Sequence, residues 1–241
     1  MIEICKKCPK TIGFLLKSSR CLRHNCQLSI VNCQFGRSPL NLPIFIKEKD
    51  VQKAMKQEML DVVDEHGMPT GKIVPRERAH REGIPHRTSH VWLLRRREGS
   101  IQILLQKRCE SKESWPGCYD ISSAGHIPAG VDFLPSALRE LEEELGVEAP
   151  PEALILCGNR WARADGFFHG RPFHDREYAR VFALWFDREA SDFRLQKEEI
   201  DAVRWMELDE ALAAVKKKTI PNCIYPEELE MVKAACPGFS K

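Results

Sequence analysis

Three glutamates are spaced so that their carboxylates could act together. Glu140, Glu143 and Glu144 occupy positions i, i+3 and i+4 of segment 136–145, whose pattern of apolar and charged residues predicts a helix. In a helix, this spacing puts the three side chains on one face, within one turn of each other. Carboxylates held so close repel one another, and a divalent cation relieves that repulsion. Oxygen ligands favour Mg²⁺ or Mn²⁺, and such an ion can bridge diphosphate oxygens and activate water.

The alternative to a metal site is an acidic helix face turned to solvent, and the residues around the glutamates distinguish these two interpretations. In Nudix hydrolases, a box reads Gly, five residues, Glu, seven residues, Arg-Glu-apolar-any-Glu-Glu-any-Gly-apolar. The positions of this chain that fall in register are Gly125, Arg139, Glu140, Leu141, Glu143, Glu144, Gly146 and Val147. A chance match at that many fixed positions is very improbable, and the chain therefore resembles the Nudix family over roughly residues 59–236.

The resemblance implies a role for each charged residue of the box helix. Glu143 and Glu144 are the expected principal metal ligands, with Glu140 assisting, and one of the three is expected to deprotonate the attacking water. Arg139 is expected to hold a box carboxylate in place by a salt bridge. The expected catalytic residues are thus Glu143, Glu144 and Arg139, and the implied cofactor is Mg²⁺ or Mn²⁺.

One box position departs from the family pattern. Val131 stands where the family has its first glutamate, and Asp132 follows one residue later. In the family, that glutamate mainly supports the structure between the loop and the helix. The three helix carboxylates remain, so hydrolysis is still expected. Val131 is the one feature that favours a binding module without catalysis.

Segments outside the box resemble the isopentenyl-diphosphate isomerase branch of the superfamily. These segments are 81–92, 105–108, 112–117, 124–126 and 175–178. The resemblance implies a second metal or phosphate site, with the candidates His86, His90, His126, Asp175 and Glu177. Isomerases place a catalytic Cys immediately before the Gly-His of this region, where this chain has Ala124. Because isomerisation needs both a positioned acid and a positioned base, we expect a hydrolase of isomerase-like architecture.

Contacts with the substrate are expected from residues close to the box. The expected set is Lys107, Arg108, Gly125, His126 and Glu177. Lys107 and Arg108 are the best candidates for phosphate contacts, because they end a predicted strand near the box. Glu198 and Glu199 are candidates for an alternative base supplied by a late loop. The expected substrate is a nucleoside or isoprenoid diphosphate, and the box does not distinguish these because loops elsewhere set specificity.

Hydrophobic periodicity and turn residues predict the elements that hold these side chains. Strands are expected at 59–64, 72–76, 86–95, 101–107, 119–124, 153–164, 177–187 and 202–208, and helices at 78–83, 136–145, 209–217 and 226–236. Asp132 is the expected N-cap of the box helix and Gly146 its C-terminal stop, with Leu141 and Leu145 facing the core. The expected class is α/β (α+β), a Nudix fold with a mixed β-sheet sandwiched between helices.

The N-terminal part of the chain differs in composition from the remainder. Residues 1–46 contain seven Lys or Arg and one acid, while the whole chain has a net charge of +2. We expect residues 1–57 to be a low-complexity or disordered leader, and residues 58–241 to form the Nudix domain. One hypothesis is that the leader is not native and that Met55 or Met59 is the true start. A zinc site at Cys5, Cys8, Cys21 and Cys26 is the weaker alternative.

Composition also narrows the expected partners. The net charge of +2 is too small to indicate a nucleic-acid or membrane partner, and no run approaches the ~18 apolar residues of a membrane span. Scattered cysteines without regular spacing favour reduced thiols and a cytoplasmic protein. The expected partner is a small-molecule diphosphate, and a homodimer is the one assembly considered. The competing functions are isopentenyl-diphosphate isomerase and a non-catalytic module that binds a nucleotide.

Overall fold

The computed structural model describes residues 57–236, so the predicted leader lies almost entirely outside the described part of the chain. The strands are β1 (Met59–Val63), β2 (Pro69–Pro75), β3 (His86–Arg97), β4 (Ser100–Arg108), β5 (Tyr119–Asp120), β6 (Ser123–His126), β7 (Ile155–Phe168), β8 (Arg171–Trp185) and β9 (Ile200–Glu207). The helices are α2 (Arg76–Glu82), α3 (Phe133–Leu145), α4 (Leu208–Lys217) and α5 (Pro226–Ala235). None of the described helices is both long and apolar enough to span a bilayer.

The expected mixed sheet is confirmed. Its hydrogen-bonded order is β5-β4-β3-β8-β7, with β6 pairing with β3 and β9 pairing with β4. β3 and β8 run parallel, from the pair His86↔Glu177 to the pair Leu94↔Trp185, whereas β3 is antiparallel to both β4 and β6. The parallel register sets the start of β3 directly beside the acidic residues of β8. β1 and β2 form a separate two-stranded sheet.

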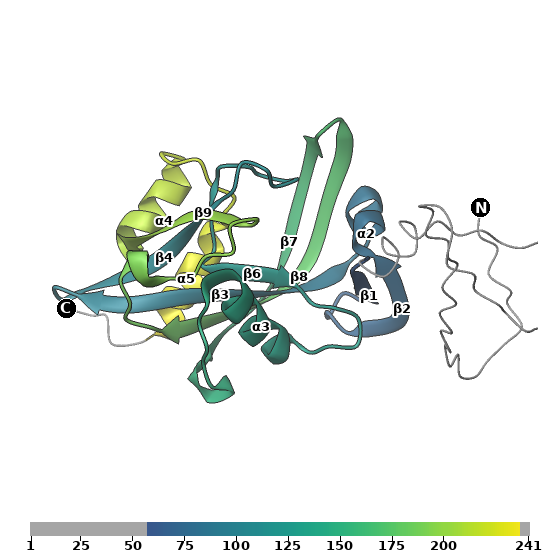
Figure 1. The fold of residues 1–241 in the computed structure, drawn as a ribbon. Helices are drawn as coiled ribbons and strands as arrows, with labels where there is room; N and C mark the ends of the chain where they lie inside the picture. The colour runs from purple at the N-terminus through teal and green to yellow at the C-terminus, as the bar shows by residue number, and fades with distance from the viewer. Residues whose placement is uncertain (1–56, 237–241) are drawn as a thin grey trace, which may run out of the picture. The chain divides into compact units, whose positions relative to one another are not determined.

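Helices cover both faces of the large sheet, as the alternation along β3 requires. Val91 and Leu93 belong to a buried cluster shared with α3, while Trp92 and Leu94 belong to a cluster shared with α4 and α5. Figure 1 shows the same arrangement, with α3 on one side of the sheet and α4 and α5 on the other. The predicted sandwich of a mixed sheet between helices is therefore confirmed.

Helix α3 begins and ends as its sequence predicts. The Asp132 carboxylate caps the first turn by accepting a hydrogen bond from the Phe133 N–H at 2.7 Å. Gly146 ends the helix with a φ of 63°, a left-handed conformation that glycine adopts without strain. Leu141 and Leu145 are fully buried. The helix is thereby fixed at both ends and along the face that packs on the sheet.

The predicted strand over 119–124 is two short strands that pair with different partners. β5 pairs with β4, and β6 pairs with β3. β3 and β4 separate between these pairings, and the Ser122 hydroxyl occupies the gap. It donates to the Leu104 carbonyl at 2.6 Å and accepts from the Leu93 N–H at 2.9 Å. This separation lets β6 approach α3, so it shapes the site described below.

Candidate functional site

A cavity of about 1070 Å³ lies between α3, the loop after β4, strand β8 and the start of α5. All three glutamates of the box helix line it, together with Arg139 and Gly125. The same cavity is lined by histidines and acids from α2, β3, β6 and β8, namely His80, His90, His126, Asp175 and Glu177. Both sets of candidate metal ligands therefore face one cavity, except for His86, which is fully buried and does not line it.

Glu144 is the most enclosed of the three glutamates. Only 6% of the residue is exposed, and its carboxylate accepts a hydrogen bond from the Ala124 N–H at 3.2 Å. Burial and the neighbouring Glu140 raise the pKa of Glu144 to about 8. Burial also raises the pKa of Glu140. Ionising these two carboxyls inside the cavity therefore costs free energy. A cation bound beside them would stabilise their charged forms.

Arg139 confirms the expected salt bridge to the box carboxylates, and it contacts two of them. Its guanidinium donates to Glu140 at 2.6 Å and to Glu143 at 3.0 Å. The Glu143 side chain is 52% exposed, so it lies at the rim of the cavity. The three carboxylates thus share a cavity at different depths, with Glu144 innermost and Glu143 outermost.

Gly125 is the residue on which the Glu140 side chain rests. A Cβ added at Gly125 would lie 2.2 Å from Glu140 Cδ and 2.4 Å from Glu140 Oε1. This contact explains why the box has a glycine here, since any larger residue occupies the space of a candidate ligand.

Replacing Gly125 with alanine is therefore expected to displace the Glu140 carboxylate. Because a flexible side chain can swing aside, the melting temperature should change little, whereas kcat should fall about 10²-fold, the typical cost of a misplaced catalytic group. The measurement compares thermal unfolding with steady-state kinetics in Mg²⁺. Gly166→Ala is the matched control, because Gly166, like Gly125, lacks a left-handed backbone and an added Cβ there would press on a side chain, the Phe168 ring, away from the lining of the cavity. A large loss of stability with unchanged kcat would contradict the role assigned to Gly125.

The expected phosphate-binding residues differ in where they lie. Arg108 lines the cavity, but its guanidinium is bonded to Asp120 at 2.9 Å and to the Ser114 carbonyl. Lys107 is not among the described residues that line the cavity. Its Nζ lies 3.9 Å from Glu110 Oε1. The basic side chain that the loop after β4 adds to the cavity is Lys112, which forms an ion pair with Glu199.

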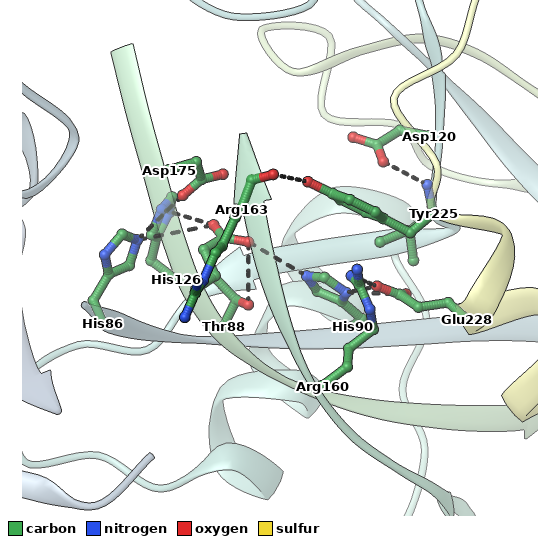
Figure 2. Close-up of polar contacts among 12 residues, drawn as sticks. His86, Thr88, His90, Asp120, His126, Arg160, Arg163, Asp175, Tyr225 and Glu228 are labelled. Atoms are coloured by element: carbon green, nitrogen blue, oxygen red, sulfur yellow. Dashed lines mark hydrogen bonds and ion pairs between the residues drawn. The ribbon is translucent and has the colours of Figure 1, made fainter. Parts of the chain in front are cut away.

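A cluster of three imidazoles and one carboxylate borders the cavity, and Figure 2 labels two of its residues, His86 and His126. His80, His86, His126 and Glu177 each offer one ligand atom, and these atoms all lie within 4.8 Å of one another. The Nε2 atoms of His80 and His126 are 3.1 Å apart, and His126 Nε2 lies 3.5 Å from Glu177 Oε1. This group, hereafter the histidine cluster, is the set of described residues that could hold a metal ion as the side chains stand.

Hydrogen bonding leaves two potential ligand atoms without partners, one in the histidine cluster and one on the neighbouring Asp175. His86 Nδ1 lies 2.8 Å from the Ile84 carbonyl, which can only accept, so Nδ1 carries a proton. In the neutral tautomer with this proton, Nε2 has the free lone pair. His86 Nε2 and Asp175 Oδ1 are buried without a hydrogen-bond partner among the described residues. An imidazole anchored through Nδ1 with a free Nε2 is the usual arrangement of a metal-binding histidine. The two orphaned atoms fit a cation.

The pKa values of the side chains in and beside the histidine cluster also favour metal binding. Burial and the neighbouring His86 lower the pKa of His80 to about 3, and burial also lowers the pKa of His126 well below its ordinary value. Both imidazoles are therefore neutral at neutral pH, which is the form that binds metals. Burial and the adjacent Glu177 raise the pKa of Asp175 well above its ordinary value, as expected for two carboxyls that share a site.

His90 was expected in this cluster, and the structure assigns it different contacts. Its Nδ1 lies 3.0 Å from Glu228 Oε1, and its Nε2 is 3.9 Å from Glu177 (Figure 2). Glu228 is fully buried on α5 and also accepts a hydrogen bond from Arg160 at 2.9 Å. His80 takes the place predicted for His90. Both His80 and Glu228 were missed from the sequence, because each meets β3 only through the tertiary fold.

Removing His86 is expected to weaken binding of a metal that prefers imidazole ligands. Calorimetric titration with Ni²⁺ should show at least about a 10²-fold loss of affinity in His86→Ala, because both a ligand and its carbonyl anchor are lost. His174→Ala is the matched control, since His174 lies on β8 outside the cluster and bonds to Asp165. Equal Ni²⁺ affinity in His86→Ala and the unmodified chain would exclude the cluster as a metal site.

Comparison with known proteins gives the family. The NUDIX domain pattern matches residues 85–225. Nudix hydrolase 3 of Arabidopsis thaliana is 42% identical over 159 residues, which cover 65% of this chain and 20% of that protein. An uncharacterized Nudix hydrolase of Clostridium acetobutylicum is 33% identical over 65% of this chain and 73% of its own length. The fold is similar to that of DR0079 from Deinococcus radiodurans, with a TM-score of 0.53 at 21% identity over 72% of this chain and 98% of that one. The matched range contains β3, β6, α3 and β8, which carry the glutamates of α3 and every residue of the histidine cluster except His80 of α2. The chain belongs to the Nudix family.

Proposed function

We propose that this chain is a Mg²⁺-dependent hydrolase, or a Mn²⁺-dependent one, that cleaves a diphosphate linkage by attack of water. The observation that carries the proposal is the buried Glu144 carboxylate, held by the Ala124 N–H beside Glu140 in a cavity of about 1070 Å³. A buried pair of carboxyls with raised pKa values is costly to ionise, and such perturbed groups concentrate at functional sites. The proposed domain is 58–241.

Three side chains of α3 would hold the ion. All three line the cavity, and Glu143, which stands at the rim, would hold the ion with a carboxylate that now accepts from Arg139. When bound, the ion neutralises charge on the diphosphate oxygens and makes water more acidic. Arg139 keeps Glu140 pressed against Gly125, which fixes the separation between α3 and β6. The donor set is all oxygen, as Mg²⁺ prefers.

The proton of the attacking water has two candidate acceptors. One is a carboxylate of α3, as the family resemblance implies. The other is Glu199, which lines the same cavity from the loop before β9 and is held by Lys112. Glu198 is not among the described lining residues. The substitution Glu199→Gln distinguishes the two candidates. If Glu199 is the base, this variant has a lower kcat and an unchanged affinity for Mg²⁺.

The proposed substrate is a nucleoside or isoprenoid diphosphate. Beyond the ligands, the cavity is lined by the aromatic residues Trp115, Phe173 and Tyr225. These side chains can pack on a base or on an isoprenoid chain. The histidine cluster is consistent with the isomerase-like branch, and the proposed second metal would lie on the β8 side of the cavity. Ala124 still separates this chain from isomerase chemistry, because a methyl group cannot transfer a proton.

A substrate panel tests the proposal. The full-length chain is incubated with nucleoside, nucleotide-sugar and isoprenoid diphosphates in Mg²⁺, and the products are followed by ³¹P NMR. We expect phosphate or monophosphate release from at least one class, with loss of that release in EDTA. Interconversion of isoprenoid isomers without phosphate release would favour the isomerase instead. Tight binding with neither product would favour a binding module and defeat the hydrolase.

A further inference from the structure

The loop 127–132 determines how the glutamates of α3 sit against β6. It joins His126, the last residue of β6, to Phe133, the first residue of α3. At Val131 this loop has an apolar side chain, half-buried against the core beneath α3, where the family pattern has a glutamate. A valine side chain cannot bond to backbone amides, and buried amides need a partner. Some other group must therefore hold the loop.

The partner is a carboxylate from a distant part of the chain. Asp61 of β1 is 8% exposed, and its Oδ2 accepts a hydrogen bond from the Gly130 N–H at 2.9 Å. The same oxygen accepts from Arg87 Nη2 at 2.9 Å. Strand β1 also bonds to the loop through its backbone, because the Met59 carbonyl accepts from the Ala129 N–H at 2.8 Å.

Arg87 of β3 extends this contact to the helix. Its Nη2 also donates to the Val131 carbonyl at 2.8 Å, and its guanidinium lies over the Phe133 ring at 5.2 Å from the centroid. The Arg87 carbonyl accepts from the Ile127 N–H at 3.1 Å. Arg87 and Asp61 are both buried, so their ion pair is little screened by solvent. Together they bond to both ends of the loop and touch the first residue of α3.

We infer that Asp61 and Arg87 are positioning residues that replace the missing box glutamate. Their ion pair, hereafter the Asp61–Arg87 clamp, holds loop 127–132 so that Glu140 and Glu144 reach the cavity at the correct depth. This role rests on the proposed hydrolase function, since positioning is defined relative to that chemistry. The clamp itself rests only on the contacts of the described residues. Through Asp61, the β1–β2 sheet also helps to position the site, although this sheet lies outside the matched NUDIX range.

Asp61→Asn is the informative substitution, because it keeps the size of the side chain and leaves Arg87 with a buried, uncompensated charge. In the full-length chain, amide exchange measured by mass spectrometry should accelerate at least about tenfold over residues 127–132. The kcat for diphosphate hydrolysis should fall by about 10²-fold, as expected when reacting groups shift by about 1 Å, and half-maximal activity should require more Mg²⁺.

Val63→Ala is the matched control, because Val63 is buried on the same strand but bonds to neither Asp61 nor loop 127–132. This variant should lower the melting temperature while kcat and the Mg²⁺ requirement stay within about twofold, since additive stability effects leave the site in place. Unchanged exchange over 127–132 in Asp61→Asn would overturn the clamp. Faster exchange with unchanged kcat would overturn its positioning role. An unmodified chain without hydrolysis would instead overturn the proposed function, and the exchange experiment would still decide the clamp.

Discussion

Replacing Glu144 with glutamine is expected to lower kcat for diphosphate hydrolysis about 10³-fold, the usual cost of removing a charged group that acts on the transition state. Glutamine has nearly the size of glutamate, and its side-chain oxygen can still accept the hydrogen bond from the Ala124 N–H. The substitution therefore removes the negative charge and keeps the packing. The measurement is steady-state kinetics at saturating substrate over a range of Mg²⁺ concentrations, with circular dichroism to verify the fold.

Glu142→Gln is the control for this experiment. Glu142 lies on the same helix two residues earlier, is exposed, and is not among the described residues that line the large cavity. Its kcat should stay within about twofold of the unmodified chain, as for most surface substitutions. If Glu144→Gln kept more than a tenth of the activity, α3 would not supply the essential ligand and the proposed mechanism would fail.

The same substitution is expected to stabilise the metal-free protein at alkaline pH. The folded-state pKa of Glu144 is raised to about 8 from an ordinary value of 4.5, so its carboxyl titrates differently in the two states. Below pH 4.5 both states hold the proton, and the group contributes nothing to the difference. Between pH 4.5 and 8 the unfolded chain releases the proton while the folded chain keeps it, so stability falls as the pH rises. At pH 8 glutamine avoids this cost, which is on the order of 4 kcal/mol for the shift from 4.5 to about 8.

Urea unfolding in EDTA at several pH values between 5 and 8 measures this effect. The stability gained in Glu144→Gln should be near zero at pH 5 and should increase toward pH 8. Mg²⁺ should reduce the difference, because an ion that binds the native state stabilises only the chain with the glutamate. A gain that is the same at pH 5 and at pH 8 would mean that the substitution acts through packing rather than through ionisation.

Glu144 is thus expected to increase the activity of the protein and to lower the stability of its metal-free form. A carboxylate that is kept dry and close to Glu140 destabilises the metal-free fold, and that same placement makes it a ligand. Sites that need strained or repelling groups commonly lose stability for this reason. Glu144 is therefore the position at which function and fold are most directly opposed in this cavity.

Much of the box region could be predicted because its signals are local. The cap and the C-terminal stop of α3 were correctly predicted at Asp132 and Gly146, and its buried face at Leu141 and Leu145. Caps and periodicity can be predicted because they depend on neighbouring residues. The depth of each glutamate was not predictable in the same way. Glu144 is buried because β6 passes close to α3, and β6 reaches that place only because β3 and β4 separate at Ser122.

Residues that act through tertiary contacts escaped the sequence entirely. His80 lies in a short polar helix whose sequence carries no signal for a ligand, and it joins His86 and His126 only when α2 packs beside β8. Glu228 resembles an ordinary acidic residue of a terminal helix, yet it is buried against His90. Asp61 lies in the predicted strand 59–64, but its contact with Gly130 depends on where β1 lies in the fold.

The parallel pairing of β3 with β8 has a consequence for the order in which the chain can fold. The hairpins β3–β4 and β7–β8 join residues that are close in sequence, whereas the register His86↔Glu177 joins two distant parts of the chain. Closing so large a loop is slow, because its entropy cost precedes the contacts that repay it. The histidine cluster needs that register, since His86 comes from one strand and Glu177 from the other. A chain that has formed only its hairpins therefore has no complete cluster, and a metal bound there would mark molecules in which the long-range pairing is finished.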